Sequence, residues 1–145
     1  MNFTELSMAA NQTLPAGTVI GLAYDGISIP SNTPRLTPVI GPGYSYVKVN
    51  DFNGFVRITM QYSWYAGAGG HSGSGTCLNT VSQDPIWGEL KLMPAGGLQE
   101  SIGWTHDVYV SPGTLIYPAG YNDNAGFVYG EGSYTFLQRY QVALL

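Results

Sequence analysis

Gly or Pro interrupts nearly every stretch of a dozen residues in this chain, and this spacing leaves no room for a long helix. The 145 residues include 20 Gly and 9 Pro, and both residue types destabilise the interior of a helix. The apolar patterns that are long enough to judge repeat every second residue, which is the period of a strand. The sequence therefore predicts an all-β fold.

The clearest strand is predicted over residues 55–65, where apolar and polar side chains alternate. The apolar positions are Val56, Ile58, Met60, Tyr62 and Trp64. Such alternation is typical of an antiparallel strand with one buried face. Asn53-Gly54 stands directly before it, and because this pair tolerates positive φ, a hairpin from residues 44–49 is expected.

Four more segments, residues 86–93, 105–110, 114–117 and 133–142, are predicted to be strands. Turn residues such as Pro94-Ala95-Gly96-Gly97 separate them. Short strands between Gly, Pro and Asn turns are the pattern of two packed sheets. We therefore expect an antiparallel β-sandwich or jelly roll over residues 44–145.

Residues 1–43 have a different composition, with few charges and many prolines. The prolines are Pro15, Pro30, Pro34, Pro38 and Pro42. Because proline lacks a backbone donor, this segment is predicted to be extended, with residues 18–23 as a strand at an edge. Two interpretations stand: an edge or surface segment that wraps the sandwich, or an arm that docks on another subunit.

Charge and cysteine content exclude several classes of function. Nine Asp and Glu against five Lys and Arg give a net charge of −4, so the clustered positive charge that binds nucleic acid is missing. The single Cys77 excludes an internal disulfide and a Cys-cluster metal site. No long apolar run exists, so no membrane insertion is expected, and the first residues do not resemble a signal peptide.

No arrangement of residues in the sequence predicts an enzyme. His71 and His106 are the two histidines, and neither stands in a catalytic motif. His71 and Ser72 fall in the glycine-rich stretch 66–75, which is predicted to be a mobile or tightly turning loop. A rigid base and nucleophile are hard to hold in such a loop, so we expect a non-enzymatic protein.

Residues 121–133 gather oxygen-bearing side chains between two predicted strands. Asn122, Asp123, Asn124 and Glu131 stand close together, with glycines among them. Two interpretations stand for this segment. Asn and Asp are common turn formers, and Ca²⁺ takes roughly six to eight oxygens from carboxylates, amides and main-chain carbonyls.

The last third of the chain contains Leu115-Ile116-Tyr117, Tyr121-Asn122-Asp123, Gly126 and Gly132-Ser133-Tyr134. Earlier segments are 56–64 followed by Tyr65-Ala66-Gly67, and 86–93 followed by Gly96-Gly97. From about residue 46 to the end, this order resembles the soluble galactophilic lectins of Gram-negative bacteria. The resemblance implies a small calcium-dependent β-sandwich that binds galactose.

The resemblance also implies which residues bind, with Asp123 shared by calcium and sugar. The implied ligand-binding residues are Asp123, Asn122, Tyr65 and His71. The predicted metal ligands are Asp123 and the carbonyl of Phe127, which the resemblance implies, together with Asn124 and Glu131 from the oxygen-bearing segment 121–133. The chain departs from the family at Gly130-Glu131, where the family has two Asn ligands, and at its sugar-contacting His-x-x-Gln, which His71 matches only by rough position.

Residues 15–23, Pro-Ala-Gly-Thr-Val-Ile-Gly-Leu-Ala, resemble the opening of phage tail-collar and tail-fibre domains. The composition, rich in Gly, Ser, Thr and Tyr and poor in charge, is similar to that of virion surface proteins. These resemblances imply a non-enzymatic surface protein of a bacteriophage, acting in decoration, as a fibre or in attachment. It would be made in the host cytoplasm and carried on the virion surface.

The alternative is a free, soluble, calcium-dependent galactose-binding lectin, located in the bacterial cytoplasm or released from the cell. Low charge and 11 Tyr favour a homo-oligomer, because interface cores are poor in charge and rich in aromatics. A trimer and a tetramer are both compatible with the sequence. The other expected partners are virion proteins and a cell-surface glycan.

Overall fold

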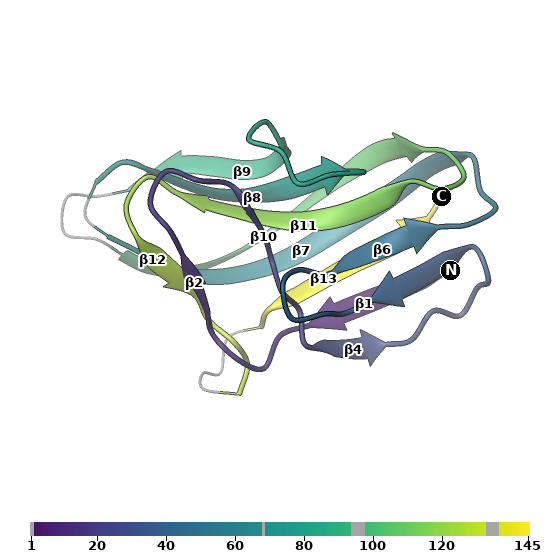
Figure 1. The fold of residues 1–145 in the computed structure, drawn as a ribbon, viewed down its shortest axis with the longest axis horizontal. Helices are drawn as coiled ribbons and strands as arrows, with labels where there is room; N and C mark the ends of the chain where they lie inside the picture. The colour runs from purple at the N-terminus through teal and green to yellow at the C-terminus, as the bar shows by residue number, and fades with distance from the viewer. Residues whose placement is uncertain (1, 68, 94–97, 133–136) are drawn as a thin grey trace.

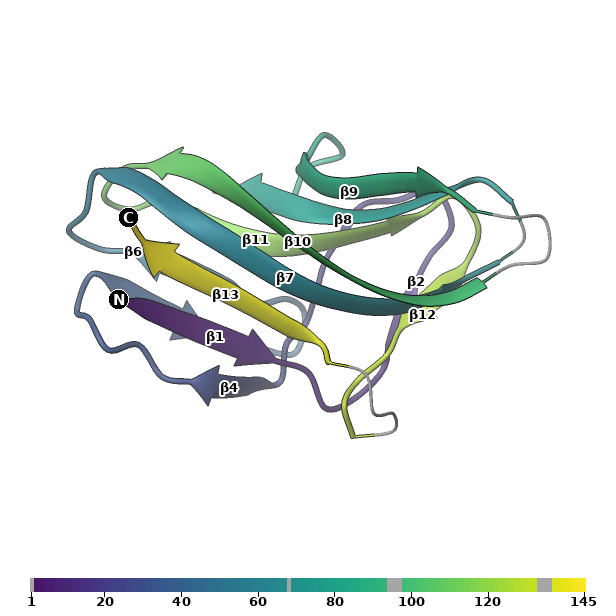
Figure 2. The ribbon, with the colours of Figure 1, turned by 180° about the vertical axis from the view of Figure 1, so that it is seen from behind.

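A computed structural model of the chain describes residues 2–67, 69–93, 98–132 and 137–145. Over these residues the structure is all-β, and its strands form two antiparallel sheets, called sheet A and sheet B. Figure 1 looks onto sheet B, and Figure 2 shows the opposite side with sheet A in front. The predicted antiparallel β-sandwich of jelly-roll type is confirmed.

Sheet A is built around the long strand β7 (Gly54–Ala66). One edge of β7 pairs along its full length with β10 (Leu98–Val110). The other edge pairs with two shorter strands, β12 (Gly126–Val128) and β13 (Arg139–Leu144). The remaining strands of this sheet are β2 (Gln12–Leu14) next to β12, β1 (Phe3–Ser7) next to β13, and β4 (Gly26–Ile29) next to β1.

Sheet B is built around β11 (Leu115–Asn122). One edge of β11 pairs with β8 (His71–Leu78), which in turn pairs with β9 (Ile86–Leu92). The other edge of β11 pairs with the remaining strands. These are β6 (Tyr46–Val49) with β5 (Leu36–Val39) beyond it, and the two-residue β3 (Ile20–Gly21).

The alternation that predicted the central strand decides the packing of β7. All five predicted apolar side chains of this strand are fully buried between the two sheets. They are Val56, Ile58, Met60, Tyr62 and Trp64. Removing apolar surface from water is the main favourable term in folding, so this strand anchors the core.

The hairpin predicted between residues 44–49 and 55–65 is wrong, because β6 belongs to sheet B and β7 to sheet A. A two-residue Asn-Gly turn needs positive φ at both central positions. Neither Asn53 nor Gly54 adopts positive φ. The backbone N–H of Asn50 donates instead to the carbonyl of Arg35, and the chain crosses from one sheet to the other.

The predicted strands 86–93, 105–110 and 114–117 correspond to β9, part of β10 and the start of β11, with residues 93 and 114 just outside the observed strands. The structure extends β10 back to Leu98 and β11 forward to Asn122. The predicted turn at residues 94–97 lies outside the described residues. So do residues 133–136 of the predicted last strand, whose later part corresponds to β13.

The separate N-terminal arm is a wrong prediction for the described residues, because residues 3–39 supply strands to both sheets. β1 lies inside sheet A between β13 and β4. Leu6 and Leu14 are fully buried in the main core. The prolines do not prevent this, since Pro38 lies in β5, an edge strand that needs no second partner. Residue 44 is therefore not a domain boundary.

The glycine-rich stretch 66–75 is the predicted turning loop only in part, because Gly69 and Gly70 turn with positive φ but β8 begins at His71. Its glycines allow β9 to approach. A Cβ on Gly75 would collide with the carbonyl oxygen of Ile86, and one on Gly73 with that of Glu89. The pairing register shifts between Ser74 and Gly75, as at a β-bulge.

Polar bonds join the two sheets in the interior at β8. The indole N–H of Trp104 on β10 donates to the Ser74 hydroxyl at 2.8 Å. The Trp104 ring fits there because position 88 is glycine, where a Cβ would collide with the ring. The Thr76 hydroxyl of β8 forms a hydrogen bond of 2.7 Å with the Tyr140 hydroxyl of β13. These buried bonds fix how the sheets are aligned.

The outer face of sheet B carries a second, smaller apolar cluster. Its buried members are Val19, Cys77, Tyr117 and Ala119. Residues 16–19, which precede β3, and residues 79–85, which connect β8 to β9, bring Val19 and Val81 onto this face. Figure 1 shows the first of these segments crossing sheet B. The described residues include no helix of the length and hydrophobicity that crossing a membrane requires.

Gly75→Ala is expected to destabilise the fold by about 1–3 kcal/mol, the usual cost of forcing an extra group into a packed region. Urea unfolding measures this as a lower midpoint. Gly43→Ala is the matched control, because a Cβ there meets nothing within 4 Å. Equal midpoints for the two variants would show that β8 and β9 are not in close contact.

Candidate functional site

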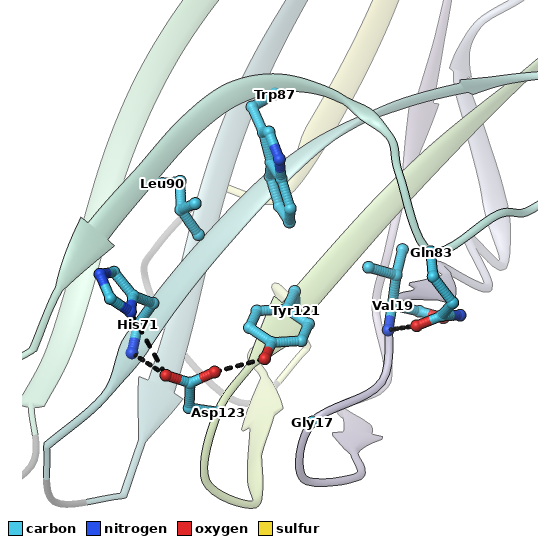
Figure 3. A pocket seen from close by; sticks show the side chains of 8 residues that line it. All are labelled: Gly17, Val19, His71, Gln83, Trp87, Leu90, Tyr121 and Asp123. Carbon is cyan, nitrogen blue, oxygen red and sulfur yellow. Dashed lines mark hydrogen bonds and ion pairs between the residues drawn. The ribbon is translucent and has the colours of Figure 1, made fainter.

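A pocket of about 370 Å³ lies on the outer face of sheet B (Figure 3). Its lining residues come from the covering segment after β2, from β8, β9 and their connection, and from the end of β11. They are Gly17, Val19, His71, Gln83, Trp87, Leu90, Tyr121 and Asp123. The volume lies within the range of small-molecule sites.

Hydrogen bonds hold the carboxylate of Asp123 in place at one end of the pocket. The Tyr121 hydroxyl donates to one oxygen, and the backbone N–H of His71 donates to the other at 2.6 Å. The backbone N–H of Asp123 donates back to the His71 carbonyl at 2.8 Å. Gly70 packs directly against the Asp123 side chain and has a φ of +72°. A Cβ on residue 70 would be only 2.6 Å from the Asp123 Cβ.

These contacts favour the ionised form of Asp123. The hydrogen bond from Tyr121 contributes most to lowering the pKa of Asp123 below its usual value, followed by the bond from the His71 N–H. The same bond raises the pKa of the Tyr121 hydroxyl. The Asp123 side chain is 37% exposed, and His71 Nδ1 lies 3.4 Å from it. Asp123 is thus a fixed, accessible acceptor.

Aromatic rings form another wall of the pocket. The rings of Trp87 and Tyr121 meet nearly edge to face, with centroids 6.0 Å apart. The half-exposed Leu90 lies beside Trp87 (Figure 3). Such rings offer an apolar surface that also carries polar groups.

Gln83 closes the side of the pocket away from His71. Its side-chain oxygen accepts from the Val19 N–H at 2.9 Å, and its amide donates to the Val19 carbonyl at 3.0 Å. This pair of bonds imitates strand pairing between the two covering segments. It fixes Val19 against the connection between β8 and β9.

The structure brings two of the four predicted sugar-binding residues, Asp123 and His71, together in this pocket. Asn122 is fully buried. Its amide donates to the Tyr65 carbonyl at 3.3 Å, and its oxygen accepts from the Ser72 hydroxyl. Asn122 and the Tyr65 carbonyl therefore bind each other, and Tyr65 stacks its ring on Phe127 of sheet A.

The predicted calcium ligands do not form a shell. Glu131 is wrongly assigned as a ligand, because both its oxygens accept from the guanidinium of Arg139, at 2.7 and 2.9 Å. Phe127 pairs in β12 between β2 and β7. The Asn124 amide donates to the Gly69 carbonyl at 2.9 Å. No three acidic, His or Cys side chains converge within the described ranges.

Sequence reasoning did not assign Trp87, Leu90, Gln83 or Val19 to the site. Trp87 and Leu90 lie on β9, an edge strand of sheet B. Large aromatic and apolar side chains on a short strand with charged neighbours are a signal that could have indicated a binding surface. Gln83 and Val19 are 64 positions apart in the sequence, and no local sequence pattern predicts a contact between them.

No protein-family model matches this chain, and no curated protein matches it. Among solved structures, the chain is similar to the Eiger TNF of S. frugiperda, with a TM-score of 0.65 and 7% identity over 99% of this chain and 92% of that chain. It is similar to murine APRIL, with a TM-score of 0.64 and 11% identity over 99% and 98%. These likenesses show the jelly-roll fold alone.

Tyr121→Phe is expected to raise the pKa of Asp123 toward its usual value, because the variant removes the hydroxyl that stabilises the ionised form. The stability that this bond adds is present above about pH 4 and is lost as the pH falls through the lowered pKa. NMR titration of the carboxyl carbon measures the shift. Tyr117→Phe is the control, and an unchanged Asp123 titration in Tyr121→Phe would contradict the geometry.

Proposed function

We propose that this protein is a non-enzymatic carbohydrate-binding protein that acts in attachment, with the sheet B pocket as its binding site. The observation that carries the proposal is the pairing of an aromatic wall, Trp87 and Tyr121, with the fixed carboxylate of Asp123. Sugar rings present apolar C–H faces and polar hydroxyl edges. A site with one apolar wall and one charged acceptor matches both.

Asp123 retains the capacity to accept sugar hydroxyls. A carboxylate has about four acceptor positions, and the Tyr121 hydroxyl and His71 N–H each take one. Hydrogen bonds to an ionised acceptor are stronger than neutral ones. Because the carboxylate is already oriented by the fold, binding a sugar costs little ordering of this side chain.

Binding without catalysis is the better interpretation of this pocket. Glycoside hydrolysis generally uses two carboxylates, roughly 5 to 9.5 Å apart, across the scissile bond. Asp123 is the sole carboxylate among the described residues that line the pocket. The carboxylates of Glu5 and Glu131 are occupied by the guanidinium of Arg139.

This proposal keeps the lectin interpretation but without calcium, since the predicted ligands bind other protein groups. The assignment to a bacteriophage virion stays a prediction from the sequence, and residues 1–43 are no longer its docking arm. A homo-oligomer is also a proposal. The outer face of sheet A supports it, because Phe55 and Tyr109 are half exposed there and pack edge to face at 5.3 Å.

A glycan array that carries neutral and acidic sugars tests the proposal. Wild-type protein is expected to bind neutral sugars equally well with Ca²⁺ and with EDTA. Trp87→Ala and Asp123→Asn are each expected to weaken binding at least tenfold, or about 1.4 kcal/mol. The losses follow from removing the aromatic surface and the charged acceptor.

The matched controls replace an exposed apolar residue and an exposed Asp elsewhere, Ile27→Ala and Asp51→Asn, and both are expected to bind as the wild type does. Thermal melts check that every variant is folded. Folded wild-type protein that binds no sugar, or unchanged binding by Trp87→Ala and Asp123→Asn, would contradict the proposal.

A further inference from the structure

A second pocket, of about 360 Å³, lies on the same covered face of sheet B. Tyr44, Asn79, Thr80, Val81 and Tyr117 line it. None of these side chains is charged. The pocket is therefore polar through hydroxyl and amide groups alone.

Aromatic rings again form a wall. The Tyr117 ring packs against Tyr44 at 5.4 Å and 76°, and against Tyr46 at 5.2 Å. Tyr44 is 51% exposed, so one of these rings is open to a ligand. Gly21 lets Tyr44 approach, because a Cβ there would be 3.0 Å from the Tyr44 Cβ.

Asn79 provides a polar group at a fixed position. Its φ of +68° lies in the left-handed region, and Leu115 holds it there. The Asn79 N–H donates to the Leu115 carbonyl at 2.7 Å, and its side-chain oxygen accepts from the Leu115 N–H at 3.1 Å. The remaining side-chain NH₂ can donate to a ligand.

The two pockets lie along one strand. Tyr121 lines the first and Tyr117 the second, and both side chains belong to the outer apolar cluster on β11. Four residues of extended strand separate them by about 13 Å. The Val19–Gln83 bridge lies between the pockets, since Val81 lines the second pocket and Gln83 the first.

We propose that the two pockets are subsites for one neutral oligosaccharide, whose chain passes over the Val19–Gln83 bridge. This inference rests on the proposed function and adds the substrate class. The Asp123 carboxylate and the net charge of −4 disfavour acidic sugars. The second pocket offers no cation to offset that repulsion. Occupying both pockets with one chain makes the second contact intramolecular, which raises affinity.

Binding to linear oligomers of one to six units tests the inference, with galactose, glucose, mannose and N-acetylglucosamine series on one array. Wild-type protein is expected to gain at least tenfold in affinity between the monosaccharide and the longest oligomer of the preferred series. Tyr44→Ala is expected to lose this gain and to keep the monosaccharide affinity. Thr80→Trp, which fills the second pocket instead of emptying it, is expected to act in the same way.

Ile27→Ala, on β4 of sheet A, is the control and is expected to keep the gain with length. Monosaccharide binding that depends on Trp87 but does not strengthen with length would overturn the second subsite and leave the proposed function standing. A gain with length that survives in both Tyr44→Ala and Thr80→Trp would do the same. Binding to no sugar would overturn both proposals.

Discussion

The outer face of sheet B is apolar, and the need to cover it shapes the rest of the structure. Cys77, Tyr117 and Ala119 point away from the main core, so leaving them in water would cost hydrophobic free energy. Residues 16–19 and 79–85 cover them, tied together by the Val19–Gln83 bridge. The cover is incomplete, and the two aromatic pockets lie where it ends on either side of the bridge.

Sequence patterns predicted the elements whose physics is local. The alternation in β7 predicts its buried face directly, because every second side chain packs into the core. β8 was missed because its glycines read as a loop, whereas close packing against the backbone of β9 requires them. β1 was missed because prolines elsewhere in residues 1–43 hid a five-residue strand, whose pairing with β13 spans the whole sequence.

The candidate site also contains residues that the sequence predicted and residues that only long-range contacts bring in. Asp123 and His71 were selected through the resemblance to galactophilic lectins, and β8 and β11 bring them together as neighbouring strands. Glu131 was misassigned because closeness in sequence to Asp123 suggested a shared ion, while Arg139 is its partner in space. Trp87 and Gln83 enter the pocket through contacts between distant segments, which depend on the register of β8 with β9.

NMR observation of the indole N–H signals during a galactose titration tests the central claim most directly. The chain has three tryptophans, and Trp64 and Trp104 are buried in the main core, so two of the signals serve as internal references. The account predicts that the Trp87 signal moves with a saturable dependence on galactose while the other two stay in place. A Trp87 signal that does not move, in protein that binds galactose, would contradict it.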